Sequence, residues 1–105
     1  MGRIRSASDH FSSARRNLIE LSFGGGPSAL IAAVRDAVAG LKALDRVALT
    51  SASATANLEA LRGMLPLWGD EDVAAEVVER LDRSRFAGAV DELASWLYFS
   101  GERAH

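Results

Sequence analysis

The sequence predicts an all-α protein, a compact bundle of four to five helices built from two antiparallel helical hairpins. Apolar residues recur at three- and four-residue spacing along nearly the whole chain, and no segment alternates apolar and polar residues for long enough to form a strand. Alanine and leucine, which favour helices, are abundant among the 105 residues. The only two prolines, Pro27 and Pro66, both stand where this periodicity breaks.

We expect the first helix at about residues 8–23, preceded by a disordered end at residues 1–7. Its apolar side chains repeat at helical spacing at Phe11, Ala14, Leu18 and Leu21. The glycines at 24–26 end it, because glycine readily adopts the left-handed backbone conformation that follows many helices. Pro27 then fits the first turn of the next helix, since its fixed φ angle suits that position.

Two helices at about residues 27–44 and 47–65 are expected to form the central antiparallel hairpin. Neither glycine nor proline separates them, so residues 44–48 form either a turn or a bend in one long rod. Residues 50–55 consist of serine, threonine and alanine, and the first two have mediocre helix propensity. The second of these helices can therefore start late.

Helices at about residues 70–81 and 84–101 are expected to form the second hairpin. Asp70 and Ser84 are the candidate N-caps, and Gly101 ends the last helix, with a disordered end at residues 102–105. Residues 1–105 are then a single helical domain. The expected core is Leu18, Leu21, Leu30, Ile31, Val34, Val38, Leu41, Leu58, Leu61, Val77, Val78, Leu81, Val90, Leu93 and Leu97.

Composition excludes several functional classes. The chain has no cysteine, which rules out disulfides, thiolate zinc sites and a cysteine nucleophile. Its 12 basic and 14 acidic residues give a net charge of −2, which does not favour binding to nucleic acid or to an anionic membrane. No apolar run is long enough to span a membrane, so we expect a cytoplasmic protein. All basic residues but Lys42 are arginine, which suggests a GC-rich bacterial genome.

Three polar motifs fall short of known chemistry. The glycines at 24–26 precede a helix, but the lysine and hydroxyl residue that a phosphate-binding loop needs are missing. His10 lies beside Asp9, yet adjacent helical residues face different directions and cannot form a proton relay. Carboxylates cluster between residues 70 and 82 without a histidine to complete a metal site. We therefore predict no enzyme activity and no catalytic, cofactor-binding or metal-binding residues.

The aromatic residues provide the main functional hypothesis. Residues 96–99 sweep about 300° around a helix, so the rings of Trp96, Tyr98 and Phe99 cannot all face one core. At least one is either exposed or covered by the C-terminal tail or by Trp68. We predict that these four aromatic residues bind a protein partner or a second copy of the chain. The protein would be a non-enzymatic bacterial or phage interaction module (adaptor, inhibitor or accessory regulator) that acts as a homodimer.

The alternative hypothesis rests on residues 73–97. The apolar positions there, Ala74, Ala75, Val78, Leu81, Val90 and Leu93, resemble the spacing in helix-turn-helix DNA-binding domains. The resemblance implies that Ser84 starts the second helix and that Arg83 and Arg85 contact phosphates. Against it, that helix continues with Asp91 and Glu92 and offers few side chains that read base edges. Nucleic acid is therefore not the partner that we expect.

Overall fold

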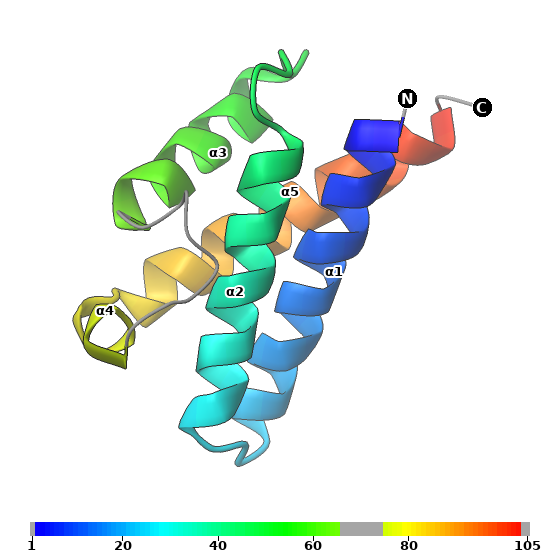
Figure 1. Ribbon diagram of the computed structural model, residues 1–105. Coiled ribbons are helices and arrows are strands. Elements are labelled where there is room, and N and C mark those ends of the chain that lie inside the picture. The colour runs from blue at the N-terminus through cyan, green and yellow to red at the C-terminus, as the bar shows by residue number, and fades with distance from the viewer. Residues whose placement is uncertain (1, 66–74, 104–105) are drawn as a thin grey trace.

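A computed structural model describes residues 2–65 and 75–103 (Figure 1). Five helices occur in these ranges, and no strand does. They are α1 (Gly2–Ser22), α2 (Pro27–Ala43), α3 (Ala52–Met64), α4 (Ala75–Arg80) and α5 (Arg83–Arg103). The predicted all-α helical bundle is confirmed.

The α1–α2 hairpin is the best-packed pair of helices, and Figure 1 shows the two running side by side. Its turn depends on two glycines. Gly24 has a φ angle of 95°, which an L-residue with a side chain rarely adopts. At Gly25 a Cβ atom would lie 2.9 Å from the carbonyl oxygen of Glu20, to which the Gly25 amide donates a hydrogen bond. Pro27 then occupies the first turn of α2.

In this hairpin, the backbone of α2 at Gly40 lies directly against a side chain of α1. The ring of Phe11 on α1 fills the space beside it, and the ring is fully buried. A Cβ atom at Gly40 would lie only 2.5 Å from the nearest ring carbon. The missing side chain at Gly40 is therefore what makes room for the largest side chain that α1 contributes to the core.

A polar contact fixes the same hairpin from its side. One carboxylate oxygen of Asp36 on α2 accepts hydrogen bonds from Ser13 Oγ and Asn17 Nδ2 on α1, each at 2.9 Å. The three side chains are partly buried. Because Ser13 and Asn17 are one helical turn apart, the contact sets both the register and the rotation of α1 against α2.

We expect Asp36→Ala to lower the free energy of unfolding by about 1–3 kcal/mol, since it leaves two partly buried donors without their acceptor. Chemical denaturation followed by circular dichroism measures this loss. Asp9→Ala, which removes an exposed carboxylate from α1, is the matched control and should change stability by less than about 0.5 kcal/mol. Equal stabilities for the two variants would show that the Asp36 contact does not hold the hairpin.

The expected pairing of the second and third helices is wrong. Helix α2 touches α3 only slightly, and α3 packs on α5 instead. The two helices do not form one rod either, because residues 44–46 make a turn in which Arg46 has a φ angle of 63°. Helix α3 starts late, at Ala52, where Ser51 Oγ accepts the Ala54 amide at 3.2 Å. The intervening segment is long enough to carry α3 away from α2.

Helix α5 lies between α1 and α3 and packs against both, crossing behind α2 in Figure 1. Its N-cap is Asp82, whose Oδ1 accepts the Arg85 amide at 3.2 Å, and not Ser84 as expected. The helix also continues beyond Gly101 to Arg103. At the other end of the chain, residues 2–7, which we expected to be disordered, form the first turns of α1, where Ala7 is fully buried.

A single hydrophobic core joins all five helices. It includes most of the expected residues, but Leu18, Leu21, Ile31 and Leu81 are only partly buried. The Val77 side chain and the candidate cap Asp70 lie outside the described part of the structure. Four large residues absent from the expected list are fully or almost fully buried: Phe11, Leu44, Leu65 and Phe86. Most of these stand near helix ends or turns, where periodicity says little about direction.

Candidate protein interaction face

The aromatic residues of α5 divide between core and surface. Trp96 is partly buried and packs against the core. Tyr98 and Phe99 are 51% and 58% exposed, and their rings meet edge to face with centroids 5.5 Å apart. Of the two expected outcomes, exposure or cover by another segment, exposure applies to Tyr98 and Phe99. Trp68, the fourth predicted partner-binding residue, lies outside the described residues.

Helical spacing places Tyr98 on a defined side of α5. Ser84, Asp91 and Tyr98 are seven residues apart, so they lie within about 40° of one another around the helix. Ser95 and Phe99 follow one turn apart on the adjoining outer side. The two exposed rings thus belong to the same surface of α5 as Asp91 and Ser95.

Arg15 joins this surface to α1. Its Nη1 donates a hydrogen bond to Ser95 Oγ at 3.1 Å and lies 3.6 Å from Asp91 Oδ1. The Arg15 side chain is about one-third exposed and that of Asp91 about two-thirds, so the ion pair is hydrated and contributes little stability. Its main effect is local charge neutrality at the seam between α1 and α5.

The same seam carries the exposed apolar residues of α1. Ile19 and Phe23 follow Arg15 at four-residue spacing, and the Phe23 amide still donates to the Ile19 carbonyl in helical fashion. They are 51% and 87% exposed. Ile19, Phe23, Tyr98 and Phe99 are the large exposed hydrophobic residues of the described chain, and they stand near the ends of α1 and α5, two helices that pack against each other. We call the surface that they define the α1–α5 face.

A groove of about 560 Å³ opens between α1 and α5, and of the four exposed hydrophobic residues Ile19 lines it. Its α1 wall includes Leu18, Ile19 and Leu21, and its α5 wall includes Ser84 and Ala87. The charged residues around it are Arg15, Asp91 and Arg83. The groove is therefore mainly apolar, with a surplus of one positive charge among its lining side chains.

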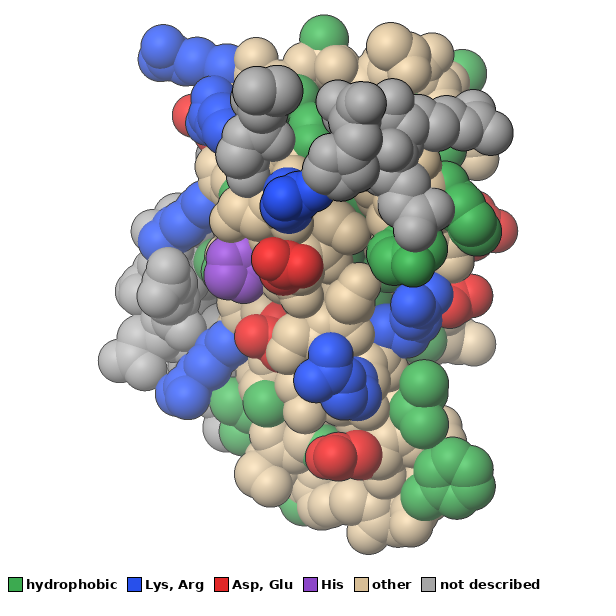
Figure 2. Space-filling view, turned by 90° about the vertical axis from the view of Figure 1, so that its right-hand side faces the viewer, with side chains coloured by type: hydrophobic (Ala, Val, Ile, Leu, Met, Phe, Trp, Pro, Cys, Tyr) green, Lys and Arg blue, Asp and Glu red, His purple; other side chains and the backbone are tan. Residues whose placement is uncertain are grey.

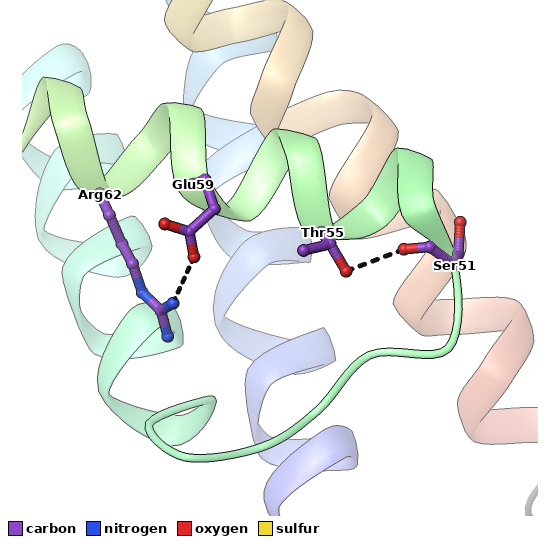
Figure 3. A network of polar contacts seen from close by, with 4 residues as sticks. All are labelled: Ser51, Thr55, Glu59 and Arg62. Carbon is purple, nitrogen blue, oxygen red and sulfur yellow. Dashed lines mark hydrogen bonds and ion pairs between the residues drawn. The ribbon is translucent and has the colours of Figure 1, made fainter.

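Figures 2 and 3 show two surfaces of the bundle. In Figure 2, which looks onto the side of the bundle where α1 runs, large hydrophobic side chains gather along the right-hand edge between charged ones. Figure 3 shows a contrasting surface on α3, where polar groups satisfy each other within one helix. Thr55 Oγ1 donates to the Ser51 carbonyl at 2.9 Å, and Arg62 Nη1 donates to Glu59 Oε1 at 2.7 Å. The outer side of α3 thus offers a natural control surface.

The residues of the DNA-binding alternative lie in the first turn of α5. Arg83, Ser84 and Arg85 are all exposed, and the first two line the groove. Asp82 caps the same turn, and Asp91 and Glu92 are exposed further along the helix. Phosphate contacts by Arg83 and Arg85 remain a prediction, and the nearby carboxylates would oppose a nucleic-acid backbone.

Two other kinds of feature are absent from the described residues. Within residues 2–65 and 75–103, no three His, Asp or Glu side chains are grouped closely enough to hold a metal ion. No helix in the described ranges has the length and apolar character needed to cross a membrane. No protein-family model, curated protein or solved structure matches the chain. The functional interpretation therefore depends on the α1–α5 face itself.

Two of the four residues that define this face were predicted from the sequence. Tyr98 and Phe99 were predicted from the crowding of rings in one turn, whereas Ile19 and Phe23 were not. The sequence does contain a signal for them. Ile19 and Phe23 are four residues apart, and they lie outside the stripe of apolar residues that this helix directs into the core. The groove left no such signal, since it depends on how α1 crosses a helix far away in the sequence.

Proposed function

We propose that this protein is a non-enzymatic protein–protein interaction module that acts as a homodimer through the α1–α5 face. In this proposal it serves as an adaptor, inhibitor or accessory regulator in a bacterial or phage-infected cytoplasm. One observation supports the proposal above all: the four large exposed hydrophobic residues of the described chain all stand on or directly after α1 and α5, which pack against each other. Monomeric proteins scatter such residues singly, and a grouped set is typical of an interaction site.

The chemistry of the face suits protein association. Aromatic residues are enriched among the anchors of interfaces because each buries a large area at a small cost in side-chain entropy. Removing one such side chain from water stabilises a complex by about 1.5–3 kcal/mol. The ion pair of Arg15 and Asp91 has no net charge. This lowers the desolvation free energy that a partner must overcome when it covers the two side chains.

The test is the oligomeric mass of the purified protein as a function of concentration, measured by sedimentation equilibrium or native mass spectrometry. We expect a dimer Kd well below about 1 mM, because a Kd near 1 mM marks the weakest specific association. Phe99→Ala should raise the dimer Kd at least tenfold. This change corresponds to a loss of about 1.4 kcal/mol or more of binding free energy, which is typical when a buried aromatic side chain is removed from an interface. Phe23→Ser should weaken the dimer in the same direction.

Thr55→Ala on the polar surface of α3 is the control and should leave the dimer Kd unchanged. Circular dichroism on each variant separates loss of association from loss of folding, because helix content stays constant if only the interface is affected. A wild-type protein that stays monomeric at the highest soluble concentration would contradict the proposal. So would a dimer whose Kd does not respond to Phe99→Ala or Phe23→Ser.

A further inference from the structure

We propose that the Arg46–Val47 peptide bond is a processing site, at which an arginine-specific endoprotease cuts the folded protein into two halves that stay paired. The proposal is independent of the homodimer, because it concerns the segment between α2 and α3. In the reaction one water molecule is added across the bond, so that Arg46 gains an α-carboxylate and Val47 an α-amino group. Endoproteases of the trypsin class bind the guanidinium group before the cut in a pocket that holds a carboxylate.

Arg46 occupies a position that no other basic residue shares. All 12 Lys and Arg residues lie within the described ranges, and Arg46 is the only one that stands outside a helix. Its side chain is exposed. Endoproteases need a chain that they can bind in an extended form, and they therefore cut exposed loops in preference to helices. For an arginine-specific enzyme, the native fold thus hides the other basic residues in helices and presents this one.

The backbone around Arg46 is suited to such binding. The chain continues without helical structure from Arg46 to Ser51, whose φ and ψ angles of −100° and 129° are extended. Arg46 itself has a φ angle of 63°, which is unfavourable for a residue with a side chain. When Arg46 becomes extended in a protease site, this strain is relieved. The hydrogen bond from the Val47 amide to the Leu44 carbonyl, 3.0 Å long, is broken in exchange.

The nearest competitors are Arg80 and Arg83, which flank the break between α4 and α5. Only two residues separate the two helices there. The Leu81 amide donates to the Val78 carbonyl at 3.3 Å, and Asp82 caps α5. This break is therefore shorter than the segment at residues 44–51, and hydrogen bonds hold it from both sides. Basic residues in the first and last turns of the chain's end helices are not competitors, because a cut there removes only a few residues.

The two halves have reasons to stay together after the cut. Residues 1–46 carry a net charge of +3 and residues 47–105 a net charge of −5, so the halves attract each other. Helix α1 of the first half packs against α5 of the second, and one hydrophobic core draws on both halves. The Arg15 contacts to Ser95 and Asp91 also join the two. The cut therefore turns internal contacts into contacts between two chains.

Limited digestion of the native protein with trypsin, followed by intact-mass spectrometry, tests the site. We expect the first internal cut to give residues 1–46 and 47–105. Arg46→Gln should lower the rate of this cut at least tenfold, because it removes the guanidinium group that the enzyme binds. Arg16→Gln, at an exposed position of α1, is the matched control and should change neither the rate nor the products. A first internal cut at any other residue would overturn the proposal.

Moving the arginine separates the effect of the segment from that of the residue. In the Arg46→Gln background, Ala48→Arg returns an exposed arginine to the same segment and should restore rapid cutting, now after residue 48. Ala56→Arg, on the exposed side of α3, should not restore it. Equal rates for the two double variants would show that cutting does not depend on the non-helical segment, which contradicts the proposal.

Size-exclusion chromatography and circular dichroism of the cut protein test whether the halves stay paired. We expect both fragments to elute together at the volume of the intact protein, with the helix content unchanged. In urea they should separate. If they part or unfold in native buffer as soon as the bond is cut, the site leads to degradation and not to processing, and the proposal is wrong.

Discussion

Gly40→Ala should lower the free energy of unfolding by about 2 kcal/mol, although alanine is the better helix former by about 1 kcal/mol. The added Cβ atom would lie 2.5–2.8 Å from three carbons of the Phe11 ring. The ring cannot swing away, because it is fully buried between α1 and α2. The two helices must separate instead, and overpacking of this kind propagates into the surrounding core. Thermal unfolding should show a midpoint lower by about 10 °C.

Two further variants isolate the cause of this loss. Gly63→Ala adds the same methyl group to α3, where nothing lies within 4 Å, and should be neutral or stabilising by up to about 1 kcal/mol. Phe11→Leu removes the far edge of the ring, so Gly40→Ala should cost less in that background than in the wild type. A double-mutant cycle with no coupling between positions 11 and 40 would contradict the packing of the Phe11 ring against Gly40.

Phe86→Ala should be the most destabilising single truncation in α5, with a loss of about 3–5 kcal/mol. The Phe86 side chain is fully buried at the start of α5, so its removal leaves a cavity that a rigid helix cannot collapse to fill. That loss is a large fraction of the total stability of a typical domain, about 5–15 kcal/mol. Urea denaturation followed by circular dichroism measures it.

The same substitution at Phe99 provides the contrast. Phe99 is mostly exposed, so Phe99→Ala should change the stability of the dilute monomer by less than about 0.5 kcal/mol. Phe86→Leu, which keeps most of the buried volume, should cost less than about 1.5 kcal/mol. If Phe99→Ala destabilised the monomer as strongly as Phe86→Ala, the Phe99 ring would belong to the core and the α1–α5 face would lose its anchor.

The features predicted well from the sequence are local ones. The glycines at 24–26 and Pro27 specify a turn, and the end of α1 and the start of α2 follow from them almost to the residue. The late start of α3 fits the poor helix propensity of Thr50 and Ser51, and Ser51 caps the helix. In each case the deciding interactions lie within a few residues of one another, and a linear sequence displays them directly.

The features that were not predicted depend on contacts between segments that are far apart in the sequence. In the sequence alone, Gly40 is a residue of low helix propensity inside α2. Its role in making room for the Phe11 ring of α1 is visible only in the structure. Whether α3 packs on α2 or on α5 depends on the path of the segment between α2 and α3, which has no sequence signature. The same holds for Ile19 and Phe23, since their exposure is decided by where α5 crosses α1.

The contact between Arg15 and Ser95 spans 80 residues of the chain. During translation α1 and α2 can fold as soon as they leave the ribosome, because their contacts are local. The seam with α5 has to wait until the segment that forms α5 has emerged. In the homodimer that we propose, two copies growing side by side on one messenger RNA would therefore not pair before α5 is made.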